Sequence, residues 1–314
     1  MSKVSIIIAC YNEGENILLM HKRLIEIFKN LEYELEIIYV DNASADNSEK
    51  NYRQLCQQDL RVKALLMSRN FGSPQPSYLA GLKNCSGDVA ILLAGDMEDP
   101  PEIIPQFIDK WRIGYQVVYG VRRGMKENYW RNLLSTLFYW FLKKMAYIDI
   151  PLNAGDFSLL DRRVINEVIQ FDERDFFLRG VRAFVGFKQI GVDFVRDKRQ
   201  AGESNTSFRV ALWWAKTIII NFSFKPLEWV SKLTFIVMIL SFLGIIINLI
   251  LYFIIPGAPR GIPTIVILTL FLGSVQLLGI SIIGEYLAKI FVEIKHRPRY
   301  IIREIVGKEG GLIN

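Results

Sequence analysis

The sequence predicts an α/β protein in which a parallel β-sheet with helices on both faces precedes a hairpin of two membrane-spanning helices. Over residues 1–121, short runs of β-branched and aliphatic residues alternate with stretches of helical spacing, the rhythm of βαβ units. Near the C-terminus two long runs, 233–255 and 262–284, carry no charge. The chain has 314 residues, 51% of them hydrophobic, and its mean hydropathy of +0.22 exceeds that of most soluble domains.

The individual elements follow from local patterns taken in chain order. Apolar, β-branched runs bounded by polar turns predict strands at 4–9, 35–40, 62–67, 89–93 and 117–121. Apolar residues that recur every three or four positions predict helices at 15–29, through Cys56, at 77–84 and at 101–111. Ligands of such sheets gather at the carboxyl ends of the strands, so residues there are the first candidates for a site.

Each uncharged run is long enough to cross a bilayer, because helices rise about 1.5 Å per residue and the hydrocarbon layer is roughly 30 Å thick. Neither run has a polar face, which disfavours two buried helices of a soluble core. The loop between them has Arg260 as its only basic residue. The flanks are basic, at Lys225, Lys232, Lys289, Lys295, Arg297, Arg299 and Arg303. The positive-inside rule therefore predicts both termini in the cytoplasm, as does the lack of a signal-peptide pattern at the start of the chain.

Two further segments, 129–145 and 206–231, combine aromatic and basic residues as helices in the headgroup zone do. Ordinary core helices are the alternative, and the residues leave it open. The expected organisation is a cytoplasmic domain over 1–205, with one interfacial helix at about 129–145, then an amphipathic interfacial helix over 206–231. Two transmembrane helices within 232–290 and a cytoplasmic tail over 291–314 follow.

Composition excludes several classes of protein. Three cysteines without CxxC spacing exclude a disulfide scaffold and a cysteine zinc site, and two histidines nearly exclude a multi-histidine metal site. Neither GxGxxG nor GxxxxGK[ST] occurs, which counts against dinucleotide cofactors and P-loop ATPases. The net charge of +6 comes without any nucleic-acid-binding motif, so an anionic lipid or a phosphorylated substrate is the expected partner, with no nucleic acid.

Polar clusters follow three of the predicted strands. They are Tyr11 to Glu13 after the first strand, Asp41 and Asn42 after the second, and Asp96 to Asp99 after the fourth. Asp96 and Glu98 in an extended turn can face one hard cation, and Mg²⁺ shares such oxygens with substrate phosphates. A single acidic turn is commonly a solvated loop, but three at one edge predict a divalent cation that carries a diphosphate.

Four segments in order carry a family resemblance: Val4-Ser-Ile-Ile-Ile-Ala-Cys-Tyr-Asn-Glu13, Val40-Asp-Asn-Ala-Ser-Ala-Asp46, Ser68-Arg-Asn-Phe-Gly72 and Asp96-Met-Glu-Asp-Pro-Pro-Glu102. They resemble family 2 glycosyltransferases of the GT-A fold, and more narrowly the polyprenyl-phosphate glycosyltransferases. The match continues through Asn153 to Arg162, Arg179-Gly180, Arg199 to Ser204, Lys225 to Leu227 and Arg297 to Tyr300. The match covers nearly the whole chain. The segments in this order are specific to the family, whereas any single segment is not.

The resemblance implies that a sugar passes from a nucleotide diphosphate sugar, with UDP-hexose expected, to a polyprenyl phosphate such as undecaprenyl phosphate. The reaction would invert the anomeric centre, use Mg²⁺ or Mn²⁺, and serve cell-envelope glycans at the cytoplasmic leaflet of the inner (plasma) membrane. A homo-oligomer is compatible with the pattern. A strong general base is not obligatory, because the acceptor phosphate is already anionic near neutral pH.

The resemblance also assigns residue roles. Asp41 matches the position that binds the nucleotide base, with Tyr11, Glu13 and Asn42 as further donor-binding residues. Asp96 is expected to act in catalysis and, with Glu98, to bind the metal. Asp156 is also expected to act in catalysis, because it matches the acid near the acceptor phosphate or the sugar hydroxyls, with a buried turn acid as the alternative. The acceptor phosphate is expected to meet Arg122, Arg131, Arg199 and Ser204, whereas Arg123 fits a surface arginine.

Two departures from the family pattern matter. The family usually has Asp-Ala-Asp-Leu-Gln-Asp where this chain has Ala94-Gly95-Asp96-Met97-Glu98-Asp99. One carboxylate is lost at Ala94 and another is gained at Glu98, which shifts the expected metal site and leaves an inactive relative as an alternative. The usual Lys of the Gly-Glu-Ser segment is Asn205, which removes one phosphate partner.

Two other functions are weighed against a glycosyltransferase of this kind. A processive polysaccharide synthase should show a Gln-x-x-Arg-Trp motif and more spans, and the sequence has neither. A non-catalytic membrane scaffold or lipid-binding module would not need Asp41, Asp96 and Asp156 at strand or turn ends.

Overall fold

The computed structural model describes residues 1–123, 154–195, 223, 225–254 and 261–307. The chain divides into two compact units. One is an α/β unit that contains residues 1–143, 148–206 and 297–314, and the other contains 144–147 and 207–296. Each unit is described by itself.

The α/β unit is built on one eight-stranded sheet with the order β7-β5-β6-β4-β1-β2-β3-β8. Along the chain the strands are β1 (Lys3–Cys10), β2 (Glu34–Asp41), β3 (Val62–Met67), β4 (Val89–Ala94), β5 (Val117–Arg123), β6 (Ala154–Asp161), β7 (Gln189–Val195) and β8 (Ile302–Val306). All five strands predicted from local patterns are present, each within two residues of its predicted bounds.

The five predicted strands all run in one direction, as the sequence indicated, but two strands that it did not predict, β6 and β8, make the sheet mixed. The strands β4, β1, β2 and β3 are parallel, but β6 runs antiparallel to both β4 and β5, and β8 runs antiparallel to β3. Local patterning missed β6 because its Ala-Gly-Asp start has low strand propensity. An antiparallel strand also needs no helical crossover, so a βαβ rhythm does not predict its position.

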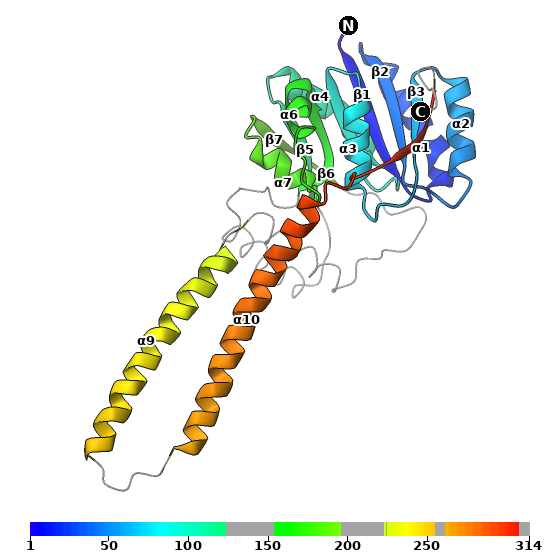
Figure 1. The fold of residues 1–314 in the computed structure, drawn as a ribbon. Helices are drawn as coiled ribbons and strands as arrows, with labels where there is room; N and C mark the ends of the chain where they lie inside the picture. Colours follow the sequence, from blue (N-terminus) through cyan, green and yellow to red (C-terminus); the bar gives the residue numbers. More distant parts are fainter. Residues whose placement is uncertain (124–153, 196–222, 224, 255–260, 308–314) are drawn as a thin grey trace. The chain divides into compact units, whose positions relative to one another are not determined.

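Helices cover both faces of the sheet (Figure 1). One face packs against α1 (Gly14–Phe28), α2 (Ser48–Gln58) and α4 (Ile104–Arg112), and the other against α3 (Gln75–Asn84), α6 (Arg162–Val168) and α7 (Leu178–Phe184). Within β1 the side chains alternate between the two layers, and nearly all are buried. Strands with two covered faces read as continuous apolar runs, which is why the sequence located them well.

Prolines set two helix starts that differ from prediction. The helix predicted at 101–111 is a 3-10 turn, η1 (Pro101–Ile103), followed by α4. Pro105 lacks an N–H and its ring would clash with the carbonyl of Pro101 in a continuous α-helix, so the helix restarts just before it. At α3 the helix begins at Gln75, two residues earlier than predicted, with Pro76 in its first turn.

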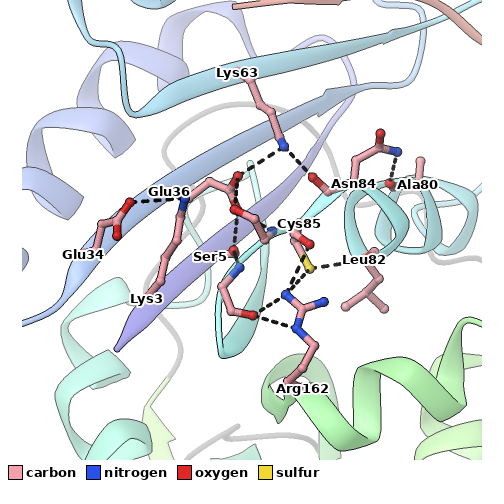
Figure 2. Close-up of polar contacts among 12 residues, drawn as sticks. Lys3, Ser5, Glu34, Glu36, Lys63, Ala80, Leu82, Asn84, Cys85 and Arg162 are labelled. Atoms are coloured by element: carbon pink, nitrogen blue, oxygen red, sulfur yellow. Dashed lines mark hydrogen bonds and ion pairs between the residues drawn. The ribbon is translucent and has the colours of Figure 1, made fainter. Parts of the chain in front are cut away.

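A buried carboxylate ties the amino ends of the parallel strands together (Figure 2). Glu36 on β2 is 9% exposed and accepts hydrogen bonds from the Ser5 hydroxyl, the Ser86 N–H (2.9 Å) and the Ser86 hydroxyl (3.0 Å). Its other contact is Lys63 Nζ on β3, at 3.1 Å. Burial opposes ionisation of Glu36, but Ser5, Ser86 and Lys63 outweigh it and lower its pKa. The network therefore joins β1, β2, β3 and the loop before β4.

The strand β8 lies within the region that the sequence assigned to a C-terminal tail. It pairs with β3 and is held to α2 by ion pairs. Arg53 donates to both oxygens of Glu304, at 2.8 and 2.6 Å, while Arg303 donates to Glu49 at 2.6 Å. β8 therefore covers β3 and itself forms this edge of the sheet.

The second unit contains two long apolar helices, α9 (Lys225–Ile254) and α10 (Ile262–Ile294). Both are long and apolar enough to cross a membrane. The candidate spans among the described residues, Lys225–Gly244 and Leu268–Ile294, each have a mean hydropathy of 1.6, and neither is buried. The Tyr286 hydroxyl of α10 donates to the Ser223 carbonyl at 2.7 Å. The segment 129–145 and most of the predicted segment 206–231, residues 206–222 and 224, lie outside the described residues, so the interfacial helices stay a prediction. Residues 225–231 form the first turns of α9.

We expect Glu36→Ala to lower the free energy of unfolding by about 3 kcal/mol, because it leaves Lys63 and the two serines without their buried partner. Glu34→Ala is the control, since Glu34 is 62% exposed and its pair with Lys3 should contribute less than about 0.5 kcal/mol. Thermal unfolding of the detergent-solubilised chain measures both.

Folding lowers the pKa of Glu36, so the contribution of this carboxylate to the free energy of unfolding should be present above about pH 4.5 and fade as the pH falls. Equal melting temperatures for the two variants would contradict a stabilising network.

Candidate functional site

The parallel strands place the predicted polar clusters side by side. The chain order reverses between β1 and β4, which are neighbours in the sheet, and β2 lies on the other side of β1. Tyr11 and Glu13 follow β1, Asp41 ends β2, and Asp96 follows β4. The register pairs Cys10 with Asp41 and Ala9 with Ala94, so the three strands end at one level. This is the topological switch point at which open α/β sheets bind their ligands.

Hydrogen bonds between the loops after β1 and β2 shape one side of this edge. Asn12 adopts a left-handed conformation, with φ of 56°, and its side-chain oxygen accepts the Ala45 N–H at 2.8 Å. In return the Asn12 N–H donates to the Ser44 hydroxyl at 2.8 Å. The two loops are therefore joined, and Tyr11 between them remains 46% exposed.

Asp41 and Asn42 lie beneath these loops. Asp41 is 3% exposed, and its carboxylate accepts the Ser44 N–H at 3.1 Å and the Ser44 hydroxyl. Burial is the main influence on Asp41 and raises the pKa of this carboxyl. Asn42 donates to Asn70 Oδ1 at 3.2 Å and accepts the Phe71 N–H at 3.0 Å, so it braces the loop after β3.

The turn after β4 presents two carboxylates to solvent. Met97 has a φ of 61° and a side chain that is 1% exposed, so it enters the core while its two neighbours remain half-buried. Asp96 Oδ1 accepts the Glu98 N–H at 3.2 Å, which holds the turn. Among the described residues no group of three or more His, Cys, Asp or Glu side chains is gathered as a metal site. The protein oxygens offered here are those of Asp96 and Glu98.

A close approach explains one departure from the family pattern. A Cβ atom on Gly95 would lie 2.7 Å from Cys10 Sγ, nearer than a real contact allows. Cys10 is 3% exposed at the end of β1, and burial raises the pKa of its thiol well above the usual range. Gly95 and Cys10 therefore fit each other, and the Ala usual at position 95 would not fit beside this cysteine.

Asp156 lies at the start of β6, next to the end of β4. The last register pair is Leu92 with Ser158, and both strands continue past it toward Ala94 and Asp156. Both carboxylate oxygens of Asp156 are engaged. Arg179 Nε donates to Oδ1 at 2.9 Å and Gln75 Nε2 donates to Oδ2 at 3.1 Å.

Two more arginines, Arg122 and Arg182, lie close to the start of β6. Arg122 at the end of β5 lies against Gly155 and has Nη2 3.7 Å from Asp99 Oδ2. Arg182 on α7 is 1% exposed, donates Nη1 to the Gly155 carbonyl at 3.3 Å, and lies 4.9 Å from the centre of the Tyr119 ring. Burial lowers the pKa of Arg182 to about 10, which still leaves it charged at neutral pH. Burial opposes ionisation of Asp156, but Arg179, Arg182 and Arg122 outweigh it and lower its pKa.

The structure thus brings together Tyr11, Glu13, Asp41, Asn42, Asp96, Glu98, Arg122 and Asp156 at one edge of the sheet. Arg131, Arg199 and Ser204 lie outside the described residues, and their placement stays a prediction. Sequence reasoning missed Gln75 and Arg182 and gave no role to Arg179. The three-residue spacing of Arg179 and Arg182, which puts both on one helix face, was the available signal.

Comparisons with known proteins identify the family of this chain. Residues 5–169 match the model of glycosyl transferase family 2. An uncharacterised glycosyltransferase of Synechocystis sp. is 36% identical over 98% of this chain and 96% of its own length. The bactoprenol glucosyl transferase of Shigella phage SfV is 34% identical over 96% of this chain and 98% of its own length. The match to a solved structure of a Pyrobaculum calidifontis mannosyltransferase in complex with GDP-Man and Mn²⁺ covers 70% of this chain and 63% of that chain, with 18% identity and a TM-score of 0.49.

We expect Gly95→Ala to destabilise the protein by about 1–3 kcal/mol, because the new methyl group would force Cys10 Sγ or the β4 end to move. Adding Cys10→Ala should recover most of that loss by making room. Thermal unfolding of the two single variants and the double variant forms the double-mutant cycle that measures the coupling. Strict additivity of the two changes would show that the approach of Cys10 to Gly95 is not the constraint.

Proposed function

The chain belongs to glycosyltransferase family 2, and on that premise we propose that it transfers a hexosyl group from UDP-hexose to a polyprenyl phosphate such as undecaprenyl phosphate, with inversion. The main support for this proposal is the set of side chains that the sheet brings together at the carboxyl ends of its strands. Half-exposed carboxylates after β4 and β1 lie beside a cluster of arginines at the junction of β5 and β6. The name of the phage relative supports bactoprenol, a polyprenyl, as the acceptor class.

The donor would occupy the β1, β2 and β4 ends. Tyr11 is exposed enough to pack against the base and Glu13 lies near the ribose position, with Asp41 beneath them. Asp96 and Glu98 fit a divalent cation, because they offer two hard carboxylate oxygens from one turn and the diphosphate supplies the rest. Bound Mg²⁺ or Mn²⁺ would neutralise charge on the departing diphosphate. The missing carboxylate at Ala94 means that the substrate contributes a larger share of the ligands here.

The acceptor would meet the arginines. Arg122 is 25% exposed, and a guanidinium suits phosphate oxygens because its donors form a planar fork. Arg131, Arg199 and Ser204 would bind the same phosphate. Since that phosphate is already anionic, its oxygen can attack the anomeric carbon as UDP leaves from the opposite face, and no residue needs to remove a proton. Catalysis then depends on alignment and on charge stabilisation.

The two apolar helices would anchor the enzyme in the inner (plasma) membrane, where its lipid acceptor resides. We place α9 and α10 across the bilayer, with the α/β unit and both termini in the cytoplasm, because the flanks are basic and the loop at 255–261 has one basic residue. Residues 1–205 would form the catalytic domain, and cell-envelope glycans would receive the product.

Purified protein should release UDP from UDP-hexose only when a polyprenyl phosphate is present, and a panel of UDP- and GDP-sugars will identify the donor. Asp96→Asn should lower kcat at least about 100-fold, because losing a metal ligand removes several kcal/mol of transition-state stabilisation. Asp109→Asn, an exposed carboxylate on α4, is the control and should behave as wild type. Full activity in EDTA would contradict the metal, and absence of lipid-dependent transfer from every sugar would contradict the function.

Membrane topology can be tested by cysteine labelling of intact cells. Ala258→Cys should react with an impermeant thiol reagent from outside, whereas Lys308→Cys should react only after the membrane is permeabilised. The parent protein is the control for its own cysteines, of which Cys10 and Cys56 are buried. The reverse labelling would place the α/β unit outside the cytoplasm.

A further inference from the structure

We propose that Gln75 is a positioning residue, which holds the Asp156 carboxylate and through it the Arg179 side chain in the alignment that transfer requires. The inference rests on the proposed function and deepens it. Its basis is one hydrogen-bonded chain, from the N–H of Leu178 through the Gln75 amide and the Asp156 carboxylate to Arg179.

The Gln75 side chain is held in one orientation by its surroundings. It is 5% exposed, and its Oε1 accepts the Leu178 N–H at 2.9 Å. An N–H can only donate, so the amide oxygen must face Leu178 and the amide nitrogen must face Asp156. Pro74 and Pro76 flank Gln75 and restrict the backbone that presents it. Gln75 is therefore pre-organised as a donor to Asp156 Oδ2.

The same hydrogen bond satisfies the start of α7. Leu178 is the first residue of that helix, where N–H groups lack partners within the helix. Arg179 is the next residue, and its Nε donates to Asp156 Oδ1. Gln75 thus contacts both the carboxylate that Arg179 binds and the backbone from which Arg179 extends. Its loss would loosen both ends of the Arg179–Asp156 pair.

Charged groups around Asp156 oppose a role in proton transfer. Arg179 and Arg182 face it from α7, Arg122 from β5, and the buried phenol of Tyr78 from α3, while Asp99 on the loop after β4 is nearest to Arg122. Both carboxylate oxygens already accept hydrogen bonds, so Asp156 suits an ionised anchor better than a base. In this arrangement Gln75 matters because it is a neutral donor that stabilises the ionised form.

The experiment compares Gln75→Ala, Gln75→Glu and the control Gln170→Glu in the full-length enzyme, with kcat and the KM for the UDP-sugar measured from pH 6 to 8.5. Gln170 is exposed at the end of α6, and its substitution should change nothing. Gln75→Ala should lower kcat about ten- to a hundredfold at every pH, the usual effect of losing a hydrogen bond to a buried charge. Its KM for the donor should change less than about twofold, because the contacts proposed for the base and ribose lie at the ends of β1 and β2, away from Gln75.

The pH dependence of kcat in Gln75→Glu distinguishes a positioning role from a merely structural one. Two carboxylates would face each other at Asp156 Oδ2, so the pKa of the pair must rise. As the pH falls, a shared proton restores the lost hydrogen bond. The kcat of Gln75→Glu relative to wild type should therefore increase at least about fivefold from pH 8.5 to 6, while the relative kcat of Gln75→Ala stays level.

Wild-type kcat in Gln75→Ala, or a pH-independent ratio for Gln75→Glu, would overturn the assignment. Thermal unfolding over the same pH range needs no substrate. It therefore tests the Gln75–Asp156 contact independently of the proposed glycosyltransferase function. A raised pKa in the folded state means that Gln75→Glu should regain stability relative to wild type as the pH falls. If wild type transfers no sugar, the proposed function fails, and a pH-independent melting difference would then also refute the Gln75–Asp156 contact.

Discussion

The in-register pairing of the parallel strands β4, β1 and β2 is the constraint on which the rest of this structure depends. Because Cys10 pairs with Asp41 and Ala9 with Ala94, three strands from distant parts of the chain end at one level. The residues that follow them must then lie next to one another. A shift of one residue in either pairing would move side chains that fit one buried layer into the other layer, so the apolar layers on both faces enforce the alignment. The site is a consequence of how the core packs.

The two ends of the parallel strands use polar residues in opposite ways. At the amino ends Glu36 is buried and has partners on β1, β3 and the loop before β4, which makes a closed network (Figure 2). At the carboxyl ends Tyr11 is exposed and Asp96 and Glu98 are half-buried. The polar groups of a buried network are already hydrogen-bonded to one another, so they stabilise the fold but cannot bind a ligand. Half-exposed polar groups bind water, which a ligand can replace. The same sheet thus has a structural end and a functional end.

The antiparallel strand β6 adds what the parallel part lacks. It starts beside the end of β4 and carries Asp156, with Arg122 from β5 and two arginines from α7 around it. A carboxylate among three guanidinium groups leaves positive charge in excess, which favours phosphate oxygens as ligands. Buried Arg182 contacts the Tyr119 ring and donates to the Gly155 carbonyl, which ties α7 to the sheet beside the cluster. Acidic and basic halves of the site therefore meet at the β4–β6 junction.

The sequence by itself determined the local elements and the chemistry at their ends. The five predicted strands and the long apolar helices follow from patterns within short windows, and the family resemblance located Asp41, Asp96 and Asp156. Which distant residues meet depends on how the elements pack together. The mixed sheet, the edge strand β8, the Gly95–Cys10 approach and the Gln75–Asp156 hydrogen bond across 81 residues have no local signature. Periodicity reports which face of an element is buried, whereas a pairing between two elements depends on strand order and register, and these are settled only when the whole core packs.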